Sequence, residues 1–357
     1  MKRIVTAIVS VGLIATVACV FTTDPETERT DLQEVCTIDG KWLSQIGPGN
    51  HALPGRATFA LLHDAHQGHW ILDAADCGLR EVKLPAPRTR EIIAPMELTT
   101  DAILYAALGS PAERYGLIEF STGHEIGGLL PQTEEGKSPG AHFSFDGKVA
   151  AWMEDGSENS RDRVHIAEID RLESGIMFAP GEQLGVDEYR LIDVVAGGEA
   201  VLLERWSGGY LLVSSSGALL RTFPLDDGVR ARSGSVRLSE RGDYVAWDGY
   251  RESGRYTIQW RINGQLVSKA LAPRSSISGA AVSPDWKWIA VSSSANTRGG
   301  GGVESVTVWF RDGTTRYHRQ LRKATRASVV FLGDDRFAYP EIDENGQATT
   351  RVFRLPS

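Results

Sequence analysis

The sequence has little cysteine, no excess of positive charge, and no long apolar segment beyond its first residues. Only three of its 357 residues are cysteine, and 38 lysines and arginines stand against 46 aspartates and glutamates. The net charge of -8 has the wrong sign for a protein that must neutralise nucleic-acid phosphates, so nucleic acid is excluded as a partner. Hydrophobic residues at 41%, charged residues at 24% and 38 glycines describe a turn-rich globular chain with a large core.

The start of the chain has the features of an export signal. Lys2-Arg3 precede an apolar run over residues 4–17, which is too short to span a bilayer comfortably. Small residues end the run at 16–18, so the sequence predicts a secretory signal peptide over residues 1–18. Loss of Lys2 and Arg3 with the signal would move the net charge from -8 to about -10.

Cys19 directly follows Ala18, and this arrangement resembles a bacterial lipobox, in which a cysteine at the new N-terminus carries diacylglycerol. Thr16 stands where that motif usually has leucine. The alternative is ordinary cleavage after Ala18, which would leave a lone thiol in an oxidising compartment, and we favour lipidation for that reason. Residues 19–35 are acidic and lack apolar periodicity, which predicts a flexible tether. We expect a periplasmic or outer-surface protein anchored to a bacterial membrane by its lipid.

The rest of the chain repeats itself at intervals of about 44 to 50 residues. Three copies of a strand, a turn and a second apolar strand are legible at 143–152, 238–247 and 282–291. A second series of marks joins further strand pairs through an X-Gly step, because glycine takes positive φ without steric cost. These steps are Cys77-Gly78, Thr122-Gly123, Ser216-Gly217, Asn263-Gly264 and Asp312-Gly313.

Filling the gaps in both series gives seven units, with six or eight as alternatives because the first, second and fourth units are degenerate. The seventh unit shows only three strands, near 327–332, 336–342 and 350–355. A strand near Lys41 to Ile46 has no partner, and we expect it to supply the missing fourth. The sequence therefore predicts an all-β fold over residues 36–357: a single, monomeric β-propeller of seven four-stranded blades, closed by an N-terminal strand.

The turn Ser283-Pro284-Asp285-Trp286-Lys287, followed by Trp288-Ile289-Ala290, and the turn Ser144-Phe145-Asp146-Gly147-Lys148 resemble the TolB-like, WD-type propeller repeat. The resemblance covers roughly residues 50 to 355 and implies the fold alone, because the family includes translocation-complex proteins, peptidase lids and many binding domains.

Motifs that would indicate catalysis are missing from the sequence. A Gly-X-Ser-X-Gly nucleophile elbow is absent, and so are the repeated Ser-X-Asp-X-Gly-X-Thr-Trp boxes of sialidases. We therefore expect a non-catalytic envelope protein that docks a protein or an envelope polymer on the loops between second and third strands. The alternative is a propeller hydrolase or lactonase that acts on a glycan or small molecule at the channel mouth.

Two cysteines remain besides Cys19, and an even pair in an exported protein predicts a disulfide between Cys36 and Cys77. Cys36 lies just before the expected closing strand, and Cys77 lies in a turn of the first blade, next to the last blade. The alternative is two buried free thiols.

Two further groups of residues are candidates for binding. The histidines His63, His66 and His69 share one loop and could bind a divalent metal such as zinc, although loop histidines are usually only solvated side chains and no other cofactor is expected. A basic run closes the sixth unit and could face anionic headgroups or polyanionic polymers, or simply block edge-to-edge aggregation. Its partner-binding candidates are Arg316, Arg319, Arg322, Lys323 and Arg326.

The lipid anchor gives a direct test. The variant Cys19→Ser loses the thiol that would carry lipid, so we expect it to leave the membrane fraction and to appear in the soluble fraction with an unchanged circular dichroism spectrum. Membrane partitioning identical to that of the parent protein would contradict the lipoprotein interpretation.

Overall fold

A computed structural model of the protein describes residues 32–43, 59–64, 68–73, 75–86, 92–98, 102–108, 114–119, 122, 124–126, 141–144, 148–154, 162–169, 171, 174–185, 188–205, 208–224, 229–231, 237–239, 245–251, 255–262, 265–271, 275–283, 285–296, 302–321, 329–342 and 346–356. Within these ranges the ordered elements are almost all strands, and the helical pieces include helix α1 (Pro180–Gln183) and the 3-10 turn Ala196–Gly198. None of the described helices is long and apolar enough to cross a bilayer.

The described strands form seven antiparallel sheets, which we number along the chain. Sheet 1 contains β2 (Lys41–Leu43), β3 (Phe59–Asp64), β4 (His69–Asp73) and β5 (Leu79–Val82). Sheet 2 contains β6 (Ile92–Leu98), β7 (Ala102–Leu108), β8 (Arg114–Glu119) and β9 (Glu125–Ile126). Sheet 3 contains β10 (Ala141–Phe143), β11 (Val149–Glu154), β12 (Arg163–Glu168) and β13 (Ile176–Phe178). Sheet 4 contains β14 (Tyr189–Val194), β15 (Ala200–Arg205), β16 (Tyr210–Ser214) and β17 (Leu219–Phe223).

The remaining sheets complete the chain. Sheet 5 contains β18 (Val229–Ala231), β19 (Arg237–Leu238), β20 (Val245–Arg251), β21 (Arg255–Ile262) and β22 (Gln265–Ala270). Sheet 6 contains β23 (Ser275–Val282), β24 (Trp288–Asn296), β25 (Gly302–Phe310) and β26 (Thr315–Leu321). Sheet 7 contains β27 (Val330–Phe331), β28 (Arg336–Ile342), β29 (Ala348–Arg354) and β1 (Gln33–Asp39).

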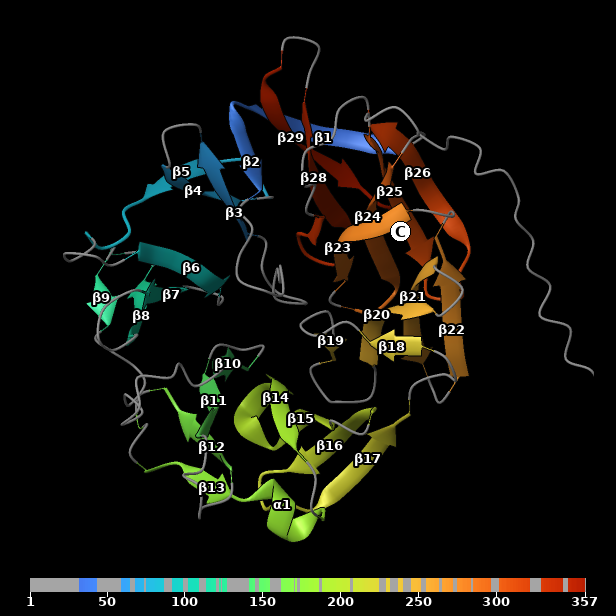
Figure 1. The fold of residues 1–357 in the computed structure, drawn as a ribbon. Coiled ribbons are helices and arrows are strands. Elements are labelled where there is room, and N and C mark those ends of the chain that lie inside the picture. Colours follow the sequence, from blue (N-terminus) through green and yellow to red (C-terminus); the bar gives the residue numbers. More distant parts are fainter. Residues whose placement is uncertain are drawn as a thin grey trace, which may run out of the picture.

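Figure 1 shows these sheets placed around a common centre in the order of the sequence, with the last strands, such as β5, β13 and β17, toward the outside. Within each sheet the strands pair with their neighbours in the chain, except that β1 pairs with β29 and β18 with β20, so most hairpin turns lie where the repeated motifs predict them. The X-Gly steps connect the last two strands of five sheets: β4 to β5, β8 to β9, β16 to β17, β21 to β22 and β25 to β26.

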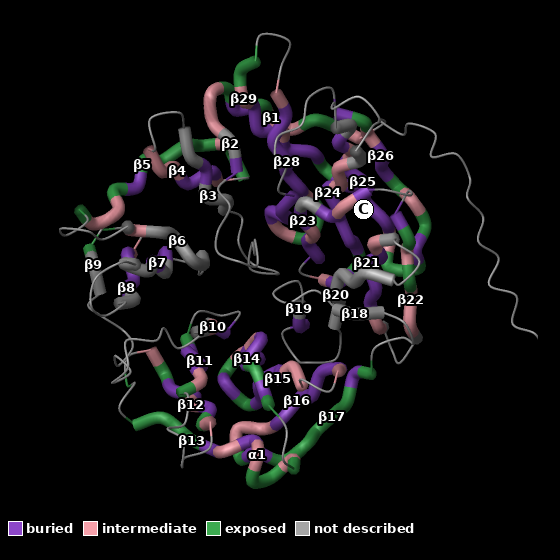
Figure 2. The backbone as a smooth tube through the Cα atoms, in the orientation of Figure 1, coloured by how far each residue is buried: buried purple, intermediate pink, exposed green. Residues whose placement is uncertain are grey.

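Apolar side chains fill the spaces between neighbouring sheets. Between sheets 6 and 7, Tyr317, Phe337 and Phe353 pack in one buried cluster, and the hydroxyls of Tyr317 and Tyr339 lie 2.8 Å apart. Burial raises the pKa of both tyrosines, so both stay neutral. Because second and third strands bury side chains on both faces, they appear in the sequence as near-continuous apolar runs. Figure 2 shows this burial in the strands around the centre.

The turn before β24 explains the repeated Ser-X-Asp motif. The Ser283 Oγ accepts a hydrogen bond from the Trp288 N–H at 2.9 Å and donates one to the Asp285 carboxylate at 2.8 Å. Ser144 repeats the first of these bonds with the Val149 N–H at 2.9 Å. Trp286 takes a left-handed φ of 55° where the repeat usually has glycine, and its side chain is buried between sheets 5 and 6. Burial of that indole offsets the cost of the left-handed backbone.

The position predicted for the N-terminal strand is wrong by several residues. The strand beside β29 is β1, which includes residues 33–35 of the expected tether, whereas the predicted segment forms β2 and pairs with β3. Only Gly40, with a left-handed φ of 69°, separates the two strands. An outermost strand such as β1 exposes Glu34, Thr37 and Asp39, so it lacks the apolar alternation by which strands are recognised.

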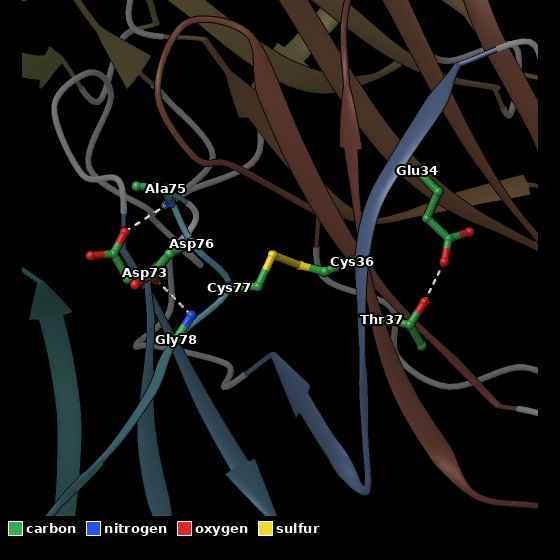
Figure 3. The surroundings of a disulfide bond; sticks show 8 residues. All are labelled: Glu34, Cys36, Thr37, Asp73, Ala75, Asp76, Cys77 and Gly78. Atoms are coloured by element: carbon green, nitrogen blue, oxygen red, sulfur yellow. Dashed lines mark hydrogen bonds between the residues drawn. A yellow bond between two sulfur atoms is a disulfide. The ribbon is translucent and has the colours of Figure 1, made fainter.

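The predicted disulfide is present between Cys36 on β1 and Cys77 in the turn between β4 and β5, and it links sheet 7 to sheet 1 (Figure 3). Their Cα atoms lie 6.5 Å apart, within the range of native disulfides. In the turn, Asp76 accepts a hydrogen bond from the Gly78 N–H at 2.8 Å. The residue with positive φ is Cys77 at 59°, rather than the glycine that the X-Gly pattern predicts.

Removal of the disulfide should destabilise the fold without changing its architecture. The bond closes a loop of 41 residues, so the chain-entropy relation gives roughly 3 to 4 kcal/mol. We expect the double variant Cys36→Ser/Cys77→Ser to lose about this much free energy of unfolding in urea and to become insensitive to reductant. A variant as stable as the oxidised parent would contradict the stabilising role, and labelling of both thiols in the denatured, non-reduced parent would contradict the bond itself.

Candidate functional site

The structure describes part of the histidine loop. His63 on β3 and His69 on β4 are direct partners in the antiparallel ladder, so their backbones are brought together at the end of this hairpin. His66 lies outside the described residues. No group of three or more histidine, cysteine, aspartate or glutamate side chains in the described parts of the chain is arranged to hold a metal ion. The metal site therefore stays a prediction from sequence.

The basic run divides into residues with different surroundings. Arg316 and Arg319 lie on β26, the outermost strand of sheet 6, and their odd spacing places them on opposite faces of the sheet. Arg316 is exposed, whereas Arg319 pairs with Glu341 of β28 at 3.1 Å. Glu341 also pairs with Arg351 at 2.9 Å. Arg319 thus joins a chain of ion pairs between sheets 6 and 7.

The other predicted members of the run, Arg322, Lys323 and Arg326, lie outside the described residues. Cys19, the predicted lipidation site, also lies outside them.

A groove of about 410 Å³ lies at a different place, between helix α1 and the outer half of sheet 4. Leu211 on its floor is buried in the core between sheets 3 and 4, and Leu184 packs against the same core. The groove therefore continues this core outward, and its volume falls in the range of small-molecule and peptide sites. It is lined by Gln183, Leu184, Arg205, Leu211, Ser216, Gly217, Ala218, Leu219 and Thr222.

Helix α1 forms one wall of the groove because local signals limit it to a single turn. Pro180 stands in the first turn, where its missing N–H costs nothing, and the Leu184 N–H donates to the Pro180 carbonyl at 2.8 Å. Gly185, with a φ of 100°, ends the helix in the left-handed conformation typical of C-terminal glycines.

Hydrogen bonds from the Gln183 side chain, which we call the latch, hold this helix against sheet 4. The Gln183 side-chain amide, in the orientation that satisfies its partners, donates to the carbonyl oxygens of Gly217 at 2.7 Å and Ser216 at 3.2 Å. Gly217 takes a φ of 86° in the turn between β16 and β17, and Gln183 occupies the space that a Cβ there would need. Only glycine satisfies both conditions, so the turn and the helix shape the groove together.

Among the described residues that line the groove, one is ionisable, the arginine at the end of β15. Arg205 donates from Nη2 to the Gly208 carbonyl at 3.3 Å, and the positive φ values of Gly208 and Gly209, 104° and 91°, form the turn beside it. Glu204, its neighbour on β15, belongs to the opposite face of the strand. Burial raises the pKa of Glu204, and Arg190 lowers it in part.

Exposed aliphatic side chains flank the groove on two outer strands, and we call them the apolar rim. Ile176 on β13 is 52% exposed, and Leu219 and Leu220 on β17 are 51% and 56% exposed. Met177 pairs with His165 on the other face of sheet 3 and contacts Arg163, so it is not part of the rim. Helix α1 begins two residues after β13 and contacts the turn before β17, so it lies between these strands (Figures 1 and 2). A register shift between β16 and β17 leaves Leu220 without a ladder partner.

The chemistry available in the groove is that of binding. The described lining residues offer apolar surface, neutral hydroxyl and amide groups and one guanidinium, and none of them is a carboxylate or histidine suited to general acid–base catalysis. The sequence reasoning missed this site. Its one signal was the consecutive pair Leu219-Leu220 after the Ser216-Gly217 step, which breaks the alternation expected of an outer strand.

Comparisons with known proteins show the fold. Neither a family model nor a curated protein matches the chain significantly. Among solved structures, the β-propeller domain of Cps50 (Swd1) from Myceliophteria thermophila is 12% identical, with a TM-score of 0.53, and the match covers 91% of this chain and 100% of that one. An oligogalacturonate lyase in complex with manganese is 11% identical, with a TM-score of 0.58 over 93% and 96% of the two chains.

TolB from Acinetobacter baumannii is 15% identical over 83% of this chain and 66% of its own, and its TM-score of 0.46 is too low to carry an argument. The prediction of an all-β protein with a β-propeller fold is confirmed by the first two likenesses. One of them is a propeller domain and the other a lyase, so the fold assigns no activity.

The latch can be tested with two glycines of similar backbone conformation. The new Cβ of Gly333→Ala meets no atom within 4 Å, so this variant reports only the strain of a left-handed backbone, about 1 kcal/mol of unfolding free energy. The new Cβ of Gly217→Ala must also displace the Gln183 side chain. We expect Gly217→Ala to cost about 2 to 3 kcal/mol of unfolding free energy in urea, because two hydrogen bonds are lost as well. Adding Gln183→Ala to Gly217→Ala should then cost almost nothing further. Equal costs for the two glycine variants would contradict the latch.

Proposed function

We propose that this protein is an exported, non-catalytic β-propeller of the bacterial envelope, tethered to a membrane through Cys19, that docks a protein partner. The signal peptide, the lipobox-like step and the acidic tether of the sequence support the location and the anchor. The docking surface in this proposal is the groove with its apolar rim, in place of the loop face expected from the repeats.

The exposed rim is the observation that carries this proposal. Three aliphatic side chains, Ile176, Leu219 and Leu220, are each about half exposed on two outer strands near a groove whose floor is apolar. Exposed apolar groups gathered around a concavity mark interaction sites in soluble proteins, because water contact with them costs free energy that a partner removes. Their burial would contribute about 25 cal/mol for each Å² removed from water.

The ring supplies the rigid scaffold in this proposal. We take the seven sheets as seven blades, with β1 as the outer strand of the last blade closing the ring against β29. A closed ring of blades leaves only short, protected sheet edges, so an outer groove can keep its shape while a tether flexes.

Site-specific crosslinking tests the docking surface in cells. A photo-crosslinking amino acid at Leu220 should give discrete adducts with an envelope protein, and Leu219→Asp in the same chain should abolish them. Leu79 on β5 is the matched control, because it is also an exposed leucine on an outer strand, at 39%. Adducts of equal yield from Leu79 and Leu220, or none from Leu220, would contradict docking at this rim.

A further inference from the structure

Strand β1 is held unevenly along its length, and its second half has several noncovalent ties. Ile38 is 8% exposed and belongs to the core between sheets 7 and 1. The Asp39 carboxylate accepts a hydrogen bond from the Thr349 hydroxyl at 3.4 Å, and the Gly40 N–H donates to the Ala348 carbonyl at 2.8 Å. The chain then continues directly into β2, so this half is tied to two sheets at once.

The first half of β1, which ends at Cys36, has weaker noncovalent ties. A register irregularity between Glu34 and Cys36 interrupts the ladder with β29 and leaves Val35 without a ladder partner. Leu32 and Val35 are only half-buried against the neighbouring cores. The ion pair of Glu34 with Arg351 joins side chains that are 38% and 31% exposed, and pairs so exposed contribute little to stability. The disulfide is therefore the strongest tie of this half.

The disulfide also lies where a reagent in solution can reach it. Cys36 and Cys77 are both half-exposed, and Asp76 and Gly78 on either side of Cys77 are exposed (Figure 3). The left-handed φ of 59° at Cys77 is unfavourable for a residue with a Cβ, so the turn gains stability once it is free to relax. Exposed or strained disulfides are the ones that are reduced most readily in folded proteins.

We propose that the bond between Cys36 and Cys77 is a redox switch, which decides whether residues 33–36 belong to sheet 7 or to the chain that precedes it. The co-reactant is a dithiol, the group that thiol–disulfide oxidoreductases carry. One of its thiolates attacks a sulfur of the bond, which forms a mixed disulfide and releases the other cysteine as a thiolate. The second thiol of the reagent then displaces the remaining cysteine. The reagent becomes a disulfide, and each cysteine gains a hydrogen.

The reduced state keeps the ring and changes only its outer seam. Residues 37–39 remain on β29 through the contacts of Ile38 and Asp39, while residues 33–36 leave it. Four released residues add about 14 Å of reach to the proposed tether. The part of the β29 edge that they covered becomes free to pair. The gain in reach rests on the proposed membrane anchor, whereas the switch itself does not.

Hydrogen exchange on the complete protein, with and without dithiothreitol as the dithiol, tests the switch. We expect exchange at residues 33–36 to become about tenfold faster or more after reduction, because local opening no longer has to break a covalent bond. Residues 38–43 of the same chain segment are the matched control and should change less than about twofold. The variant Cys36→Ser/Cys77→Ser should show the reduced pattern in both buffers, which separates the effect of the bond from that of the reagent.

The rate of reduction tests whether the bond is reached in the folded protein. Thiols that appear in native buffer would be trapped with iodoacetamide and counted by mass spectrometry. We expect the rate to rise in proportion to the dithiothreitol concentration, with no plateau at the rate of global unfolding. Oxidation of the reduced protein should restore slow exchange at residues 33–36.

Three results would overturn the inference. Unchanged exchange at residues 33–36 after reduction would show that noncovalent contacts alone hold the first half of β1. Equal acceleration at residues 33–36 and 38–43 would show that the bond staples the whole closure and switches no part of it. A reduction rate that reaches a plateau would show that the bond opens only when the protein unfolds. None of these results touches the proposed docking function, which crosslinking at Leu220 tests separately.

Discussion

The pairing of β1 with β29 is the interaction on which the rest of the structure depends. It joins residues 33–39 to residues 349–354, at opposite ends of the chain. Sheet 7 would otherwise have three described strands, and the cluster between sheets 7 and 1 would lose Ile38. Such a long-range pairing has a high loop-closure cost, so it needs supports that are independent of the strand's own propensity.

Those supports are visible around β1. Arg351 of β29 pairs with Glu34 of β1 at 3.1 Å, and the Thr350 hydroxyl donates to the Lys41 carbonyl at 3.0 Å. The bond from Cys36 to Cys77 then ties β1 to the neighbouring sheet. Because Cys36 is near the start of β1, this covalent bond holds the strand to sheet 1 against separation from its N-terminal end.

The groove depends on the same architecture in a different way. Antiparallel sheets placed around a centre pack closely near that centre and separate toward the outside, so the spaces between their outer strands must be filled by added segments (Figure 1). Helix α1 fills part of the space beside sheet 4 and leaves Leu219 and Leu220 exposed. The contact of Gln183, on this helix, with Gly217 sets the width of the groove that remains open.

Much of the fold could be predicted from the sequence because each hairpin carries its own local signal. Ser283 and Asp285 bond the backbone of their own turn, and the X-Gly steps mark the turns between the last two strands of five sheets. Strand β1 was misplaced because an outer strand held by partners more than 300 residues away needs no apolar alternation. The site was missed because the contact of Gln183 with Gly217 is tertiary and no local pattern encodes it.

Amide hydrogen exchange tests the central proposal, that the rim of sheet 4 is the surface that a partner covers in the envelope. Exchange at residues 219–223 would be compared between isolated envelopes and the purified protein without its anchor, with residues 79–82 of β5 as the reference outer strand. The account predicts slower exchange at 219–223 in envelopes and no change at 79–82. Unchanged exchange at 219–223, with slowing confined to other surfaces, would contradict it.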